Sequence, residues 1–360
     1  MTTHLLAEQR LIVCVGAGGV GKTTTAAALA LAAAHAGRRA AVITVDPARR
    51  LKDALGLQEL SIDPHPVEVG GVSFDALALD AKRTFDDLVR RFAPSRAAAE
   101  RIYANRIYAE VSNELAGSAE YMAMEKLHEL LHTHDYELIV VDTPPSANAR
   151  DLLAAPNRLA NLLASKAVGL LQAPASLLSF GSNALSRATL STLLKALQRW
   201  TGLQLLDDLA DFVGAFEGMI DGFRERADEI QGLLRSQQTS FVLVTSTEPS
   251  TIAQTIAFHR DLVVDAFPVA GVIANRVFDF PSPEACAAAL AAWEEPLRGK
   301  LVRNQAELHE LTRRDAVSLE RLQSETGLRL LAAVPQATEA PASLAALEAF
   351  AQELLRDAAS

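Results

Sequence analysis

The sequence predicts an α/β protein with a doubly wound, mostly parallel sheet and an inserted α-helical subdomain. Short apolar segments alternate along the chain with longer segments of helical periodicity, which is the order expected of β-α units. A glycine-rich loop joins the first apolar segment to the first helix, and two long helical stretches interrupt the alternation. We therefore expect a sheet core at residues 1–80, 136–147 and 237–360, and a helical subdomain at residues 81–135 and 148–236.

Composition narrows the classes of function. The 360 residues carry a net charge of −10, which argues against a nucleic-acid-binding surface. The two cysteines, Cys14 and Cys286, form no C-x-x-C motif, so we expect no zinc clip of that type. Residues 1–9 lack the apolar segment of a signal peptide, and no uninterrupted apolar run reaches the ~18–20 residues of a membrane span. We expect a cytoplasmic protein.

The glycine-rich loop predicts a polyphosphate site. An apolar strand, Leu11–Val15, leads into Gly16–Thr23, which matches G-x-x-x-x-G-K-[ST], and a helix is expected over Lys22–Ala36. Glycines let backbone N–H groups turn inward, and the helix N-terminus adds positive potential. We expect Lys22 to contact the β- and γ-phosphates of a nucleotide and Thr23 to bind Mg²⁺, as in a P-loop NTPase core. The predicted phosphate-binding residues are Gly16, Gly18, Gly19, Val20, Gly21, Lys22, Thr23 and Thr24.

The loop permits two other interpretations. Gly16, Gly18 and Gly21 also match the dinucleotide fingerprint, with Asp46 as its acidic residue, but that interpretation leaves Lys22 and Thr23 without a role. The second alternative is a glycine-rich turn that binds nothing.

Asp46 follows the second predicted strand, Arg39–Val45, and precedes Pro47. Ligands of doubly wound sheets bind at such C-terminal strand ends. Asp46 is therefore a candidate catalytic residue that orients an attacking water, and a candidate residue of the Mg²⁺ site with Thr23 and Asp142. Lys22 is the other candidate catalytic residue, through its contact with the phosphates. The alternative for Asp46 is a capping residue for a short helix over Ala48–Leu55.

A second nucleotide-binding motif follows the predicted strand Tyr136–Val141. Four apolar residues followed by Asp142 fit the Walker B pattern, whose aspartate belongs to the magnesium shell. Together with the glycine-rich loop, this motif predicts a Mg²⁺-dependent nucleotide hydrolase. The remaining strands of the sheet are expected at Val72–Leu79, Ser240–Thr245, Pro268–Ala274 and Leu328–Val334.

Helical periodicity covers most other segments. Helices are expected at Ala81–Phe92, Ser95–Leu115, Ser118–Leu131, Ser250–Asp265 and Leu344–Arg356, with further helices in Ser282–Thr326. The leucine-rich run Leu152–Leu209 permits two interpretations. Its stripes either pack against one another or line an open groove for an apolar client.

The motifs together resemble the arsenical pump-driving ATPase family, whose eukaryotic branch targets tail-anchored membrane proteins. The residues that match are GAGGVGKTT at 16–24, DPA at 46–48, VDTPPSANARDLL at 141–153, NR at 275–276 and VPQ at 334–336. They follow the family's order across almost the whole chain.

The resemblance implies roles for individual residues. Asp46 would polarise the attacking water, and Asp142 would belong to the second switch. Asn275 and Arg276, with Pro335 and Gln336, would surround the adenine of ATP. The resemblance also implies a dimer, from two copies of this chain or with a related ATPase, in which ATP opens and closes the helical subdomains.

The chain departs from the family pattern at Ala17, where the family has a lysine that reaches the partner's nucleotide. Its two cysteines also do not match the metalloid-binding set, so arsenite is not expected. Three interpretations of function follow. The first is an ATP-hydrolysing dimeric switch whose helical subdomain binds an apolar client, such as a segment of a membrane protein. The others are an ATP-binding, chaperone-like subunit with little hydrolysis and a motor subunit of an anion transporter.

Overall fold

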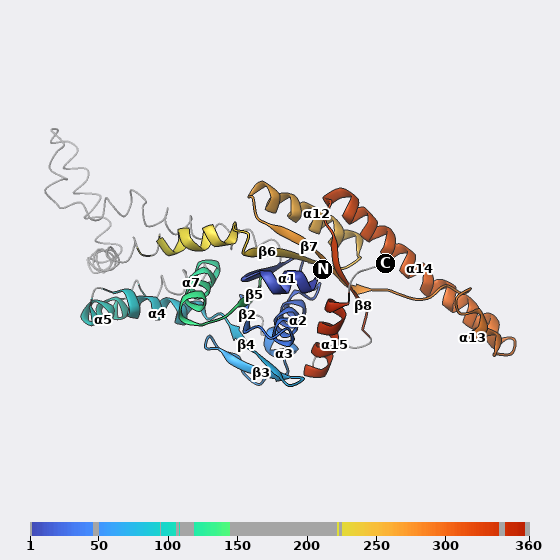
Figure 1. Ribbon diagram of the computed structural model, residues 1–360, viewed down its shortest axis with the longest axis horizontal. Helices are drawn as coiled ribbons and strands as arrows, with labels where there is room; N and C mark the ends of the chain where they lie inside the picture. The colour runs from blue at the N-terminus through green and yellow to red at the C-terminus, as the bar shows by residue number, and fades with distance from the viewer. Residues whose placement is uncertain are drawn as a thin grey trace, which may run out of the picture. The chain divides into compact units, whose positions relative to one another are not determined.

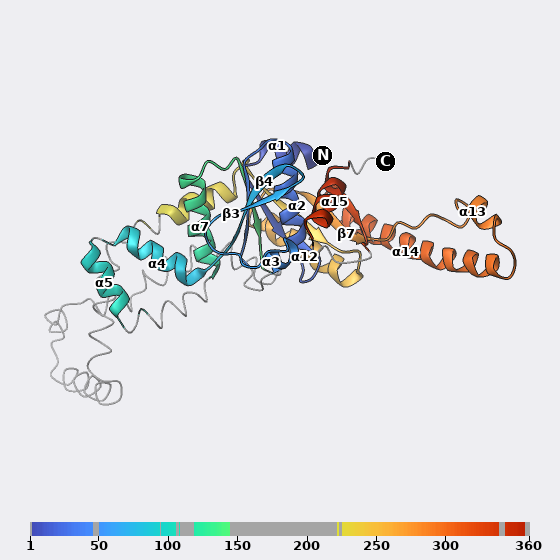
Figure 2. The ribbon, with the colours of Figure 1, turned by 90° about the horizontal axis from the view of Figure 1, so that it is seen from below.

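The computed structural model (Figures 1 and 2) describes residues 2–45, 50–93, 95–105, 108, 119–144, 222, 225–337 and 343–356. The chain divides into two compact units. The first contains residues 1–79, 130–150 and 232–360, and the second contains residues 80–129 and 151–231.

The first unit is built on an eight-stranded sheet in the order β3-β4-β2-β5-β1-β6-β7-β8. Every neighbouring pair is parallel except β3 and β4. The strands are β1 Leu11–Val15, β2 Ala40–Thr44, β3 His65–Val69, β4 Val72–Ala78, β5 Leu138–Asp142, β6 Thr239–Thr245, β7 Val269–Val277 and β8 Leu330–Pro335. The predicted fold class is confirmed.

The central strands are apolar on both faces because helices cover both. All residues of β1, β2, β5 and β6 are buried. On one face, α2 (Lys22–His35) packs on β1, β2, β4 and β5, with α15 (Leu344–Leu355) and α1 (Thr2–Glu8) beside it. The small alanine side chains of α2 allow this close approach, and the helix is buried along almost its whole length.

Two longer helices cover the other face. Helix α12 (Pro249–Val264) packs on β6 and β7 and against α14 (Leu297–Thr326). Helix α14 continues past the sheet, and the short α13 (Ala287–Ala291) lies beside its outer end (Figures 1 and 2). Helix α3 (Arg50–Ala54), in contrast, packs against α2, the central helix of the first face.

The described part of the second unit is helical. It contains α4 (Ala81–Phe92), α5 (Arg96–Ala104), most of α7 (Ala119–Thr133) and most of the helix of residues 225–234. The helix predicted over Ser95–Leu115 is interrupted, because α5 ends at Ala104 with Asn105 as its C-cap. Asn105 has extended backbone angles, so the helical hydrogen bonds stop there.

Two elements were not predicted from the sequence. Helix α1 precedes the first strand, and β3 forms an antiparallel hairpin with β4 through Gly70 and Gly71. Both glycines have positive φ, as the two central residues of a type I′ hairpin turn require. Among the described residues, no helix combines the length and the apolar character needed to cross a membrane.

Candidate nucleotide-binding site

The glycine-rich loop connects β1 to α2 through backbone conformations that exclude larger residues. Gly16 has φ +156, and a Cβ at this position would collide with the Val244 carbonyl of β6. Gly21 has φ +94, and a Cβ there would collide with the Asn275 amide. Gly18 and Gly19 are exposed at the tip of the loop, Val20 is buried, and Thr24 is half-buried in the first turn of α2. The loop is therefore held against two neighbouring strands while its tip stays open.

Lys22 is the first residue of α2 and is only 6% exposed. Its Nζ donates a hydrogen bond to the Ala17 carbonyl across the loop at 2.9 Å. The ammonium group is thus inside the loop, at the positive end of a 14-residue helix. This arrangement provides a localised cation beside backbone N–H groups, which suits a polyphosphate.

Asp142, at the end of β5, joins the loop to the sheet. Its Oδ2 accepts hydrogen bonds from the Thr23 hydroxyl at 2.8 Å and from the Thr44 hydroxyl at 2.9 Å. Asp142 is 1% exposed. Parallel pairing of β2 with β5 places Thr44 beside Asp142, so strand register creates this network. Hydroxyl and carboxylate oxygens are the donors that Mg²⁺ prefers, so Thr23 and Asp142 fit that ion.

The residue after Asp142 is also fixed. The Thr143 hydroxyl donates to the Cys14 carbonyl of β1 at 2.8 Å. Burial raises the pKa of the Cys14 thiol far above its ordinary value, and the negative charge of Asp142 adds to the rise while Lys22 opposes it. Cys14 is therefore a neutral, packed side chain of β1.

Asn275 lies on β7 and is 6% exposed. Its Nδ2 donates to the Val20 carbonyl of the loop at 2.8 Å, and its Oδ1 accepts from the Arg276 backbone N–H at 2.9 Å. Arg276 itself has φ +60. Each end of the Asn275 amide keeps a second hydrogen-bonding position. A contact with adenine would have to use one of these.

The last strand lies next to β7. Pro335 pairs in register with Val277, and the Gln336 backbone N–H donates to the Val277 carbonyl at 2.9 Å. The Gln336 side chain donates to the Ala337 carbonyl at 2.8 Å. The structure thus brings the ends of β7 and β8 together, as the predicted adenine pocket requires.

Several predicted features lie outside the described residues. They are Asp46, the candidate water-orienting residue, and the leucine-rich run Leu152–Leu209. Thr44, in contrast, was missed by the sequence prediction. Nothing in the sequence around Thr44 marks it as a site residue; it can be recognised only from the pairing of β2 with β5, which places it beside Asp142.

A family model described as anion-transporting ATPase matches residues 9–310. The chain belongs to the anion-transporting ATPase family. The resemblance drawn from the motifs is thus confirmed, and membership of this ATPase family agrees with the predicted enzyme class.

Individual relatives show the same relationship. ATPase get3 of Aspergillus terreus is 26% identical over 274 residues, which cover 76% of this chain and 74% of that protein. ATPase ASNA1 homolog 1 of Paramecium tetraurelia is 30% identical over 147 residues, covering 39% of this chain and 42% of that protein. A Halobacterium salinarum protein, provisionally named an arsenical pump-driving ATPase, is 31% identical over 159 residues, covering 42% of this chain and 24% of that protein.

The matched length differs among the relatives. In four of them the match covers only 24–42% of their own length. The family assignment therefore supports an ATP-binding site, whereas the substrates and partners of the whole protein are proposals.

Proposed function

We propose that this chain binds Mg²⁺ and ATP at the glycine-rich loop and hydrolyses ATP to ADP and phosphate. The observation that supports the proposal most strongly is the convergence of Lys22, Thr23 and Asp142. Thr23 on α2 donates to Asp142 at the end of β5 at 2.8 Å, and Lys22, the residue before Thr23, donates to the Ala17 carbonyl of the loop at 2.9 Å. The three residues are the cation, the hydroxyl and the carboxylate that phosphoryl transfer uses.

Each group has a defined part in this proposal. The loop backbone and Lys22 hold the phosphates, and the buried loop base excludes water from one side. Thr23 and Asp142 would hold Mg²⁺, which neutralises charge that develops on the transferred phosphoryl group. Asp46 would orient the attacking water, and its place in the sequence shortly after the second strand motivates that assignment.

The adenine would lie between the ends of β7 and β8. Asn275 and Arg276 on one strand and Pro335 and Gln336 on the other are the proposed contacts. The pairing of Val277 with Pro335 supports this placement because it joins the two strand ends.

The wider function follows from the family. The relatives get3 and ASNA1 homolog 1 are named as ATPases, and we propose that this chain acts as a dimeric nucleotide switch. Its helical subdomain, residues 81–135 and 148–236, would bind an apolar client such as a segment of a membrane protein.

One observation favours a second candidate, an ATP-binding subunit with slow hydrolysis. Ala17 is 6% exposed and packs in the hydrophobic core. This position therefore supplies no cation to a partner's nucleotide, and such a cation can accelerate phosphoryl transfer ~10³–10⁵-fold. The name of the halobacterial relative motivates a third candidate, the motor subunit of an anion transporter. Stimulation of ATP turnover by oxyanions would test this candidate.

The decisive experiment for the proposed site is equilibrium binding of ATP in the presence of Mg²⁺. Lys22→Ala should weaken binding at least tenfold, about 1.4 kcal/mol. Lys52→Ala is the matched control, because Lys52 is a lysine of the neighbouring helix α3 that pairs with Asp53. Equal affinity of the parent and Lys22→Ala would refute the phosphate-loop assignment.

A further inference from the structure

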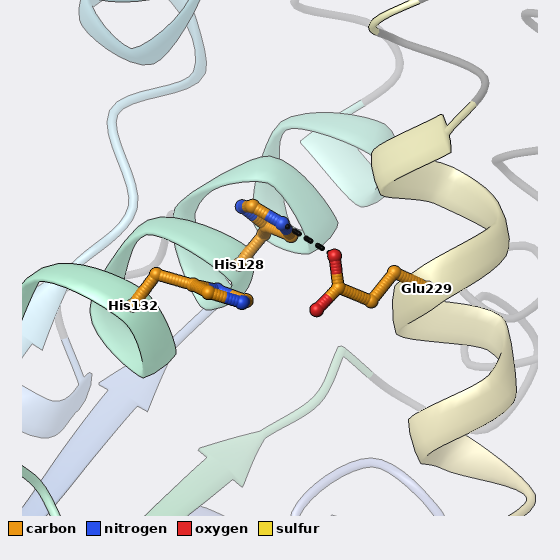
Figure 3. A group of neighbouring side chains, drawn as sticks. All are labelled: His128, His132 and Glu229. Atoms are coloured by element: carbon orange, nitrogen blue, oxygen red, sulfur yellow. Dashed lines mark hydrogen bonds and ion pairs between the residues drawn. The ribbon is translucent and has the colours of Figure 1, made fainter.

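A second group of metal-ligating side chains shares no residue with the glycine-rich loop. His128 and His132 lie on α7, and Glu229 lies on the helix of residues 225–234. Figure 3 shows the three side chains pointing into the space between these two helices. One ligand atom from each lies within 4.8 Å of the others.

Helix geometry explains why the two histidines act together. They are four residues apart on one continuous helix, so their rings lie on the same face, one turn from each other. Their spacing therefore depends on α7 alone. Two imidazoles at this separation are a common way for a helix to present two ligands to one metal ion.

Glu229 completes the group from the facing helix. Its Oε2 is 3.0 Å from Nε2 of His128. The His128 side chain is 18% exposed and that of Glu229 is 54% exposed, and His132 is exposed as well. A metal ion and a water ligand can therefore reach the three side chains without any rearrangement of buried residues.

The neighbouring acid on α7 is engaged elsewhere. Glu129 forms ion pairs with Lys126 at 3.3 Å and with Arg91 at 3.6 Å. These two cations thus neutralise Glu129, whereas Glu229 faces the histidines. The group consists of two imidazoles and one carboxylate.

We propose that His128, His132 and Glu229 form a binding site for a divalent transition metal ion, with Zn²⁺ as the best match. Two nitrogen donors and one oxygen donor suit Zn²⁺, which also accepts a water as fourth ligand. Mg²⁺ and Ca²⁺ prefer sets made of oxygen donors alone. The ion replaces the direct contact between His128 and Glu229 and links α7 to the facing helix. Its physical consequence is a metal-dependent fixation of this helix pair.

The test is metal binding by the full-length, chelator-treated protein. Zn²⁺ is titrated without nucleotide and in excess Mg²⁺, which saturates the oxygen ligands of the loop. We expect one Zn²⁺ per chain with a dissociation constant of about 1 µM or lower. Co²⁺ in place of Zn²⁺ should give the visible absorption bands of a four- or five-coordinate ion.

The variants assign the ligands. His132→Asn and Glu229→Gln alter exposed side chains, so both should fold, and each should weaken Zn²⁺ binding at least tenfold. His134→Asn is the matched control, since this histidine follows α7 by one residue and stacks on Tyr136 with ring centroids 5.4 Å apart. It should bind Zn²⁺ like the parent.

Three results would overturn the proposal. The first is no Zn²⁺ binding below about 100 µM. The second is binding that both ligand variants retain in full. The third is binding that Cys286→Ser abolishes, which would assign the ion to that thiol. None of these results depends on ATP binding or turnover, so the outcome is independent of the proposed ATPase activity.

Discussion

Thr44→Val should destabilise the protein through Asp142. The substitution keeps the shape of a β-branched side chain in β2 and removes the hydroxyl that donates to Asp142 Oδ2 at 2.9 Å. Both residues are at most 2% exposed, so water does not replace the lost bond. A hydrogen bond to a charged group contributes about 1.5–3 kcal/mol. We expect the free energy of unfolding to fall by that amount.

The matched control is Thr255→Val on α12. The Thr255 hydroxyl is also buried, but it bonds only neutral groups, the Thr245 hydroxyl at 3.0 Å and the Thr251 carbonyl at 2.9 Å. Its loss should cost about 0.5–1.5 kcal/mol. Urea unfolding followed by circular dichroism measures both variants. If Thr44→Val lowers the free energy of unfolding no more than Thr255→Val does, the reasoning is refuted, because the buried Asp142 carboxylate is then not stabilised by the Thr44 hydroxyl.

Three further predictions test other parts of the structure. Gly21→Ala should reduce ATP affinity at least tenfold, because its Cβ meets the Asn275 amide, whereas Gly37→Ala, which also has positive φ but open space around it, should leave ATP affinity unchanged. Since burial raises the pKa of Cys14, the folded thiol stays neutral where the unfolded thiol ionises. The free energy of unfolding should therefore fall with rising pH above about 8.5, by at most about 1.4 kcal/mol per pH unit from this group, and Cys14→Ala should flatten the curve. Arg226→Met should cost about 3–5 kcal/mol, because it removes the guanidinium whose Nε lies 2.7 Å from the Glu125 carboxylate, a side chain that is 2% exposed. The double variant with Glu125→Leu should recover most of that loss, and a double variant as unstable as Arg226→Met would contradict the ion-pair argument.

The sequence predicted the elements around the glycine-rich loop well because several signals coincide there. An apolar strand, fixed glycines and an alanine-rich helix define β1 and α2 to within one residue of the expected bounds. Strand β3 was missed because it contains Pro66, and only two of its five residues are buried, so it has little apolar periodicity. An edge strand needs few apolar residues because one side faces solvent.

Side-chain partners were harder to predict than elements. Thr44 meets Asp142 only because β2 pairs with β5, and the two residues are 98 positions apart in the chain. Likewise, the sequence shows that Ala17 lacks a cation, but only the structure shows that its side chain is buried. Ala17→Lys would therefore place an ammonium group in the core, and it is a poor way to restore the family's lysine.

Phosphate release from ATP, measured with the purified chain and Mg²⁺, tests whether the glycine-rich loop is a site of ATP hydrolysis. The parent should release phosphate, and Lys22→Ala should lower the rate at least tenfold. Asp46→Asn should lower the rate by roughly 10²–10⁴ while keeping ATP affinity, because the loop rather than this carboxylate holds the nucleotide. A parent that releases no phosphate, or a rate that neither substitution changes, would contradict the assignment of ATP hydrolysis to this site.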